Sequence, residues 1–165
     1  MRLLLSVLAT LLLTIAAHAQ APRIDRIDIF EKGVFQNERT QSRPDPKSPT
    51  GTHDTVTNIR LVENTTTVRA RHGVDVGIRF TVVGAPQGAV VPLKVIQRYP
   101  KAGIRNPQTG QTTYIYEHSF TEKIGGSHYD GYGFDNPWEE VPGVWTFEVW
   151  YQGRKLATQS FTVTK

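Results

Sequence analysis

Strict alternation of apolar and polar side chains is the feature that most constrains the fold of this chain. Between residues 74 and 82 the even positions are all apolar, whereas the odd positions hold Asp, Gly, Arg and Thr. Successive side chains of a β-strand point to opposite faces, so this pattern predicts a strand with one buried face. Similar alternation recurs at 91–95, 114–120 and 144–151, and in weaker form at 24–35, 57–69 and 155–164. About seven strands are therefore expected.

These strands predict an all-β fold. A sheet with one apolar face has to bury it against a second layer, so we expect an immunoglobulin-like antiparallel two-sheet sandwich, with a small β-barrel as the alternative. The chain contains no cysteine, so its core must stabilise it without disulfides. A tight hairpin turn is expected at residues 151–154, where Gly153 can adopt a positive φ.

The N-terminus has the pattern of a secretory signal peptide. A positive start at Met1-Arg2 precedes an apolar run over 3–17 and small residues at Ala17 and Ala19. We expect cleavage after Ala19, which leaves 20–165 as one β-sandwich domain in the periplasm or outside the cell, without a membrane anchor. A retained N-terminal anchor is the alternative.

Charge gives no indication of nucleic-acid binding. The chain has 19 Lys and Arg against 15 Asp and Glu, a net charge of +4, and its basic residues are scattered. Phosphate backbones are bound by clustered basic surfaces. We expect no nucleic-acid partner, and expect instead a protein or glycan of the cell envelope.

Two segments are expected to lie outside the strands. The first, 36–55, contains no hydrophobic residue and three prolines. It cannot offset its ordering entropy by burial, so it is predicted to be a mobile polar loop. The second, 125–143, contains an unusual stretch at 128–138, where four aromatic residues alternate with Gly and Asp.

Two interpretations of this aromatic loop remain open. Its rings either plug the open end of the sandwich or form an exposed platform for a sugar ring, a peptide or a partner strand. The candidate ligand-binding residues are Tyr129, Asp130, Tyr132, Phe134, Asp135 and Trp138. Trp150 shares the polar face of its strand with Glu148, so it is a candidate interface residue.

The sequence contains little that indicates a catalytic site or a metal site. Ser127 and His128 are adjacent, and neighbouring residues of an extended chain point apart. His128 and Asp130 could share one side of a strand, but two ligands are too few for zinc, and His118 is expected to be packed or at an edge. We expect no cofactor, metal or catalytic residue.

A non-enzymatic binding or scaffolding module is the leading hypothesis. The alternatives are a carbohydrate-binding module that uses 128–138, and a hydrolase or metal-dependent enzyme centred on His128 and Asp130.

The segment 137–150 resembles the signature of a bacterial family. It contains Pro142-Gly143 followed by Trp145, Phe147-Glu148 and Trp150. This pattern is similar to that of small exported bacterial proteins catalogued as a domain of unknown function, and further matching stretches occur at 83–88, 103–110 and 153–157. The resemblance implies an immunoglobulin-like fold and export, and it brings no known activity or site.

Overall fold

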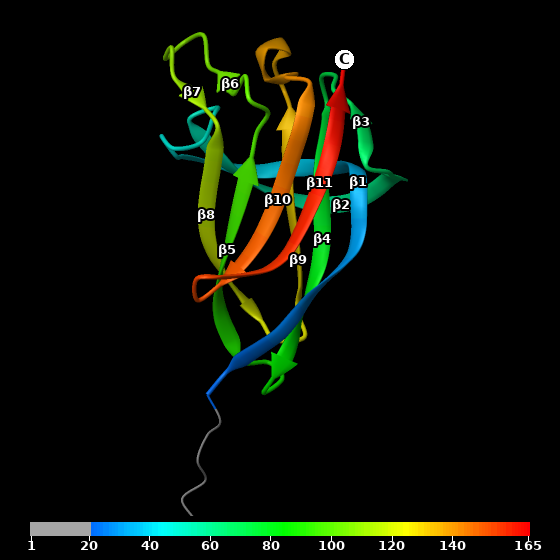
Figure 1. Cartoon of the computed structure of the whole chain (residues 1–165), viewed down its shortest axis with the longest axis vertical. Coiled ribbons are helices and arrows are strands. Elements are labelled where there is room, and N and C mark those ends of the chain that lie inside the picture. The colour runs from blue at the N-terminus through cyan, green and yellow to red at the C-terminus, as the bar shows by residue number, and fades with distance from the viewer. Residues whose placement is uncertain (1–20) are drawn as a thin grey trace, which may run out of the picture.

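The computed structural model describes residues 21–165; the expected signal peptide, 1–19, lies outside the described residues. Four strands form the first sheet (Figure 1), in the order β2 (Thr52–Asn64), β1 (Arg23–Pro44), β4 (Val74–Ala85) and β9 (Ser127–Phe134). Five form the second, in the order β3 (Thr67–Arg69), β11 (Arg154–Thr164), β10 (Gly143–Tyr151), β5 (Val90–Arg98) and β8 (Ile115–Lys123). A short pair, β6 (Ile104–Arg105) and β7 (Thr112–Thr113), and a 3-10 helix η1 (Pro137–Glu139) complete the described chain. None of its helices is long and apolar enough to cross a membrane.

The apolar faces of the two sheets meet in one core. The even positions of β4 from Val74 to Val82 are all buried, as the alternation predicts. Opposite them lie the inward residues of β5 and β10, among which Trp145 is fully buried. All strand pairs within the two sheets are antiparallel except β3 with β11. The predicted two-sheet sandwich is therefore confirmed, and the alternative, a closed barrel, is not formed.

Local turn chemistry also follows the sequence. Tyr151 pairs with Arg154 across the turn that joins β10 to β11, and Gly153 has a φ of +77°. The weak strand expected over 57–69 is divided in two, because β2 ends at Asn64 in the first sheet and β3 begins at Thr67 in the second. The chain crosses between the layers there, which reverses the side that faces the core.

The predicted loop at 36–55 is wrong in most of its length. Residues 36–44 continue β1 and pair with residues 52–60 of β2, so only 45–51 forms a turn. We call this hairpin, residues 36–60, the arm; Figure 1 shows it crossing the other strands of the sandwich. Backbone hydrogen bonds and polar contacts order it, which a test based on apolar burial alone overlooks.

Gly33 marks the place where the arm begins. Its φ is +136°, and a Cβ at this position would overlap the carbonyl oxygen of Glu63. Only glycine fits such a conformation and such a close backbone approach. Just beyond it β1 ends its pairing with β4, at Phe35, and continues with β2 alone. The strand can therefore leave the sheet without breaking its hydrogen-bond ladder.

The second predicted loop also contains a strand. Residues 127–134 form β9, which pairs with β4, so 125–143 is not entirely irregular. Gly131 and Gly133 occupy outward positions of β9 and do not mark turns. A Cβ on Gly131 would overlap the Tyr129 hydroxyl, and one on Gly133 would overlap a carboxylate oxygen of Asp75. The glycines keep this outer face flat, so that other side chains can lie directly on it.

Candidate functional site

The arm is held to the first sheet and to the β6–β7 pair. The Arg79 guanidinium on β4 donates a hydrogen bond to the Ile59 carbonyl at 2.6 Å, and just before the arm the Phe35 ring packs on Tyr129 with centroids 4.9 Å apart. Past the edge of β9, the Asn106 amide between β6 and β7 donates to the Pro49 carbonyl at 3.1 Å. The arm thus covers the open side of the sandwich, where β9 of one sheet faces β8 of the other.

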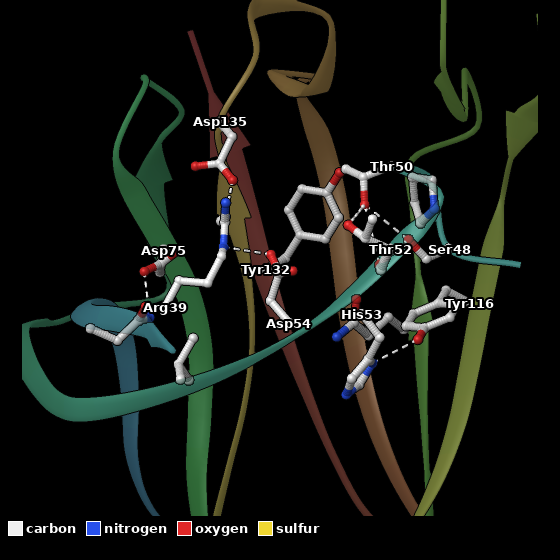
Figure 2. Close-up of a pocket in the computed structure, with 15 residues that line it drawn as sticks. Arg39, Ser48, Thr50, Thr52, His53, Asp54, Asp75, Tyr116, Tyr132 and Asp135 are labelled. Carbon is white, nitrogen blue, oxygen red and sulfur yellow. Dashed lines mark hydrogen bonds and ion pairs between the residues drawn. The ribbon is translucent and has the colours of Figure 1, made fainter. Parts of the chain in front are cut away.

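Two cavities lie against the arm and share His53, Asp54 and Val56 in their walls. The first, which we call the Arg39 pocket, has a volume of about 120 Å³. Figure 2 shows the Arg39 side chain reaching between Asp54 of the arm and Asp135 beyond β9. Its guanidinium forms ion pairs with both carboxylates, at 2.7 Å to Asp54. Arg39 therefore pins the arm to the end of β9.

Asp75 is the unusual acid of the Arg39 pocket. It accepts a hydrogen bond from the Asn37 amide at 2.5 Å. Burial, reinforced by the nearby charge of Asp135, raises the pKa of Asp75 to about 6. Asp75 consequently changes charge just below neutral pH, at the base of the arm.

A hydrogen-bonded chain joins the tip of the arm to β8. The Tyr116 hydroxyl donates to Asp45 Oδ2 at 2.8 Å and lies 2.8 Å from His53 Nδ1 (Figure 2). Because the single hydroxyl proton goes to Asp45, His53 Nδ1 is the donor to the tyrosine oxygen. Burial lowers the pKa of His53, and the charge of His118 lowers it further. A neutral His53 then leaves Nε2 as a free acceptor.

A buried polar bridge joins the two sheets below the arm. The His118 Nε2 atom on β8 lies 2.9 Å from Asp130 Oδ2 on β9. Gln97 on β5 donates to Asp130 Oδ1 at 2.8 Å, and the Tyr99 hydroxyl donates to Gln97 Oε1 at 2.9 Å. Only 10% of the His118 side chain and 4% of the Asp130 side chain are exposed. Each member of the bridge is thereby held in one orientation.

The bridge is an ion pair. Burial alone would raise the pKa of Asp130, but the charge and hydrogen bond of His118, with the hydrogen bond from Gln97, outweigh burial and lower it. Burial alone would likewise lower the pKa of His118, but Asp130 outweighs burial and raises it. Both shifts favour a protonated His118 beside an ionised Asp130, and in that form His118 carries two N–H donors.

The second cavity, which we call the His118 cleft, lies below the arm and has a volume of about 390 Å³. It is lined by His53, Asp54, Thr55, Val56, Ile59, His118, Ser127, His128, Tyr129, Asp130 and Gly131. Two of its residues carry a buried polar atom without a hydrogen-bond partner, Asp54 Oδ1 and His118 Nδ1, whereas the Tyr129 hydroxyl accepts from the Asn37 amide.

The structure separates the candidate residues of the aromatic stretch. Tyr129 and Asp130 line the His118 cleft, whereas Tyr132 and Asp135 line the Arg39 pocket. Phe134 is fully buried in the core. Trp138, on η1, packs against the edge of the core. The rings of Tyr132 and Phe134 form edge-to-face contacts with Trp145, so the stretch fills the sandwich, and no exposed aromatic platform is formed by these residues.

The enzyme alternative centred on His128 and Asp130 has no assembled geometry in the described residues. The Ser127 hydroxyl pairs with that of Thr81 at 3.1 Å and not with an imidazole. His128 stacks on Phe120 with ring centroids 3.8 Å apart. Asp130 is paired with His118 instead. In residues 21–165 no group of three or more potential metal ligands converges.

Trp150 lies on the outer face of the second sheet. Its indole N–H donates to Glu148 at 3.0 Å, and the Lys155 ammonium lies 6.0 Å from the ring centroid. The indole borders a shallow groove of about 410 Å³ that also contains Pro92 and Ile96. Trp150 is therefore partly covered by its own strand neighbours and lies apart from the arm and its two cavities.

Sequence reasoning missed most residues of the arm and of the polar bridge. His118 shares the parity of the buried Tyr116, which indicates the inner face of β8. Nothing in the sequence pairs His118 with Asp130, because that contact joins strands of different sheets. Arg39, His53 and Asp54 fall in the predicted loop, so the alternation rule gives them no face.

Comparison with known proteins places this architecture in a family. No curated protein matches the chain significantly. The crystal structure of an immunoglobulin-like protein (PA1606) from Pseudomonas aeruginosa is similar with a TM-score of 0.58 and 28% sequence identity, covering 88% of this chain and 98% of that one. The sandwich is thus immunoglobulin-like. A family model described as a domain of unknown function (DUF3859) matches residues 24–163, and the chain belongs to this family.

Proposed function

We propose that this chain is an exported, non-enzymatic binding module whose ligand occupies the His118 cleft. The observation that carries the proposal is that two buried, unpartnered polar atoms, Asp54 Oδ1 and His118 Nδ1, belong to residues that line one cavity. An unpartnered buried polar group costs about 1–3 kcal/mol, so two of them at one cavity are best explained by a partner that binds there.

The architecture supports this role. The His118 cleft lies between a rigid floor, built from the sandwich, and the arm, which is held mainly by polar contacts. Pockets of a few hundred Å³ with a few convergent polar groups are typical ligand sites. The immobile His118–Asp130 pair supplies a fixed donor, whereas the arm can adjust to what binds.

Amide chemical shifts of the processed chain test the proposal. The ¹⁵N-labelled protein is titrated with a mixture of small polar metabolites: sugars, amino acids, dipeptides and nucleosides. We expect saturable shifts confined to the cleft, at His53, His118 and 127–131. Shifts elsewhere, or none, would contradict the proposed site, and turnover of the bound compound would contradict a non-enzymatic role.

A matched pair of variants locates the binding. Thr55 and Thr57 are both exposed residues of β2, but only Thr55 lines the cleft. Thr55→Trp places a large ring at the cleft and should abolish the shifts. Thr57→Trp adds the same ring outside it and should leave them unchanged. Equal behaviour of the two variants would place the ligand elsewhere.

Export is tested separately by the intact mass of the protein recovered from outside the cytoplasm. The proposal expects a chain that begins at Gln20. A mature chain that still begins at Met1 would contradict it.

A further inference from the structure

The His118 cleft runs along an open strand edge. Five consecutive residues of β9, 127–131, line it, and β9 is the last strand of its sheet in the described chain. The edge of a sheet carries N–H and C=O groups that can pair with a further strand. The cleft therefore combines a cavity of about 390 Å³ with a backbone that is able to form more hydrogen bonds.

Alternate residues of β9 point their backbone groups to that edge. The carbonyls of Gly126 and Phe134, at the two ends of β9, accept from backbone N–H groups on the β4 side. The even-numbered residues between them therefore pair with β4, and the odd-numbered residues of 127–131 face the open edge. The Gly131 carbonyl agrees with this direction, because it accepts a hydrogen bond from Gln97 of the second sheet at 3.3 Å.

The arm limits what can reach this edge. It crosses from β4, where Arg79 binds the Ile59 carbonyl, to β8, where His53 binds Tyr116 (Figure 1). A second folded sandwich would bring its own sheets against the arm before its edge strand reached β9. A single extended segment needs only one strand spacing, about 4.8 Å. An isolated strand is therefore the occupant that suits an edge lying below the arm.

The two unpartnered atoms of the cleft require the same chemistry. Asp54 Oδ1 belongs to a carboxylate and can only accept, and His118 Nδ1 can only donate while His118 is protonated. A ligand therefore has to offer a donor and an acceptor together. Each peptide group carries one N–H and one C=O, so an extended peptide offers both to the side chains as well as to the strand edge.

We propose that the His118 cleft binds an extended peptide segment by strand addition to β9, an inference that rests on the binding role proposed above. The backbone of the segment pairs with the edge-facing groups of Ser127 and Tyr129 and with the N–H of Gly131. Val56 and Ile59 of the arm cover its side chains. Main-chain hydrogen bonds supply the affinity in this mode of recognition, and the walls of the cleft select the side chains.

Hydrogen exchange of the processed chain tests the pairing directly. The probe is the capped peptide Ac-Lys-Thr-Val-Thr-Val-Thr-Lys-NH2, and its control has proline at the third and fourth positions, which removes donors from both edges. At saturation the amides of Ser127, Tyr129 and Gly131 should exchange about tenfold more slowly or better, the effect of one hydrogen bond each. Those of His128 and Asp130, already paired with β4, should keep their rates. The proline peptide should change none of them.

Two proline variants each block one strand edge. Ser127 on β9 and Thr121 on β8 are both exposed, but only Ser127 lines the cleft. Tyr114 and Ile124, at the two ends of β8, bond to the β5 side, so the N–H of Thr121 also faces an open edge. Proline is tolerated at such positions because the N–H that it removes has no strand partner.

Calorimetry with the capped peptide compares the variants. Ser127→Pro should weaken binding roughly tenfold, and Thr121→Pro should leave it unchanged. Equal losses, or a loss in Thr121→Pro alone, would overturn the assignment to β9. The exchange pattern is measured on the unmodified chain, so it decides the proposal even where a proline variant fails to fold.

Further outcomes separate strand addition from the binding role. If the peptide binds without the odd-and-even alternation, or the proline peptide binds as tightly, strand addition is overturned and the cleft remains the site. If the peptide does not bind while the metabolite mixture still shifts the cleft amides, the peptide is overturned alone. Silence to both overturns both proposals. Protection of the odd-numbered amides in a dimer without peptide, detected by light scattering, would make a second copy the occupant and overturn the peptide.

Discussion

The interior of the sandwich is held in two different ways. Around Trp145 the contacts are between rings: Tyr99, Tyr132 and Phe134 lie with centroids 4.9–5.4 Å from the indole. Around Asp130 they are hydrogen bonds and an ion pair, shared among three strands. Apolar packing is non-directional and tolerates adjustment, whereas a buried polar bridge depends on every member being in place. The polar region is also the one that borders a cavity.

Removal of the indole should have the largest effect on stability. Trp145→Ala leaves a large void in the fully buried core, and such truncations cost about 3–5 kcal/mol. We expect the urea midpoint of the processed chain to fall sharply. Retention of wild-type stability would mean that the core does not depend on this cluster.

The polar bridge should respond to a much smaller chemical change. Asp130→Asn preserves shape but leaves His118 without its counter-ion, at an expected cost of about 3 kcal/mol. His118→Gln in the same chain removes the stranded charge, so the double variant should recover part of that loss. Urea unfolding of the single and double variants measures the difference, and strict additivity would show that the two side chains do not interact.

The same ion pair has a definite pH window. Asp130, with its lowered pKa, stabilises the fold above the ordinary aspartate value of 3.8 and loses that contribution as acid protonates it in the folded state. His118, with its raised pKa, stabilises the fold below the ordinary histidine value of 6.5 and loses its contribution as the pH rises through its folded pKa. A histidine NMR titration should find the pKa of His118 above 6.5 in the wild type and lower in Asp130→Asn.

The contribution of Asp75 to the pH dependence of stability should have the opposite sign to that of Asp130. Its folded pKa of about 6 lies above the ordinary value of 3.8, so the folded state binds the proton more tightly and this group adds stability as the pH falls from 7 towards 4. The expected gain is about 1–2 kcal/mol, less than the full linkage value of about 3 kcal/mol because the group is partly solvated. Asp75→Asn should remove this part of the pH dependence, measured as the urea midpoint against pH. An unchanged profile would place the pKa of Asp75 near its ordinary value.

Loosening the arm should have the smallest effect on global stability. Half of the Arg39 side chain is exposed, so Arg39→Ala should cost no more than about 1 kcal/mol. Hydrogen exchange should nevertheless become faster in 36–56, with the amides of β4 and β10 unaffected. Uniformly faster exchange would show that the arm and the sandwich unfold as one unit.

The sequence predicted the sandwich better than its extensions. Alternation at 74–82 and 144–151 identified buried faces, because the period of two is a local property of a strand. The same rule failed for 36–44, where polar residues occupy both faces of the hairpin. It also failed at β9, which was expected to lie outside the strands; there Gly131 and Gly133 serve close packing on the outer face of the sheet. At both places the composition predicted irregular structure, although the only thing missing was a run of alternating apolar residues.

The candidate site shows the same division. The unusual composition around Tyr129 and Asp130 does mark residues of the cleft, whereas the rings of Tyr132 and Phe134 are buried. By itself the sequence determined the strand faces, the need for a core without disulfides and the family. Only the tertiary structure decided that His118 pairs with Asp130 and that the arm covers a cleft. These contacts join strands from opposite sheets, and no local pattern specifies which distant side chains the folded sheets bring together.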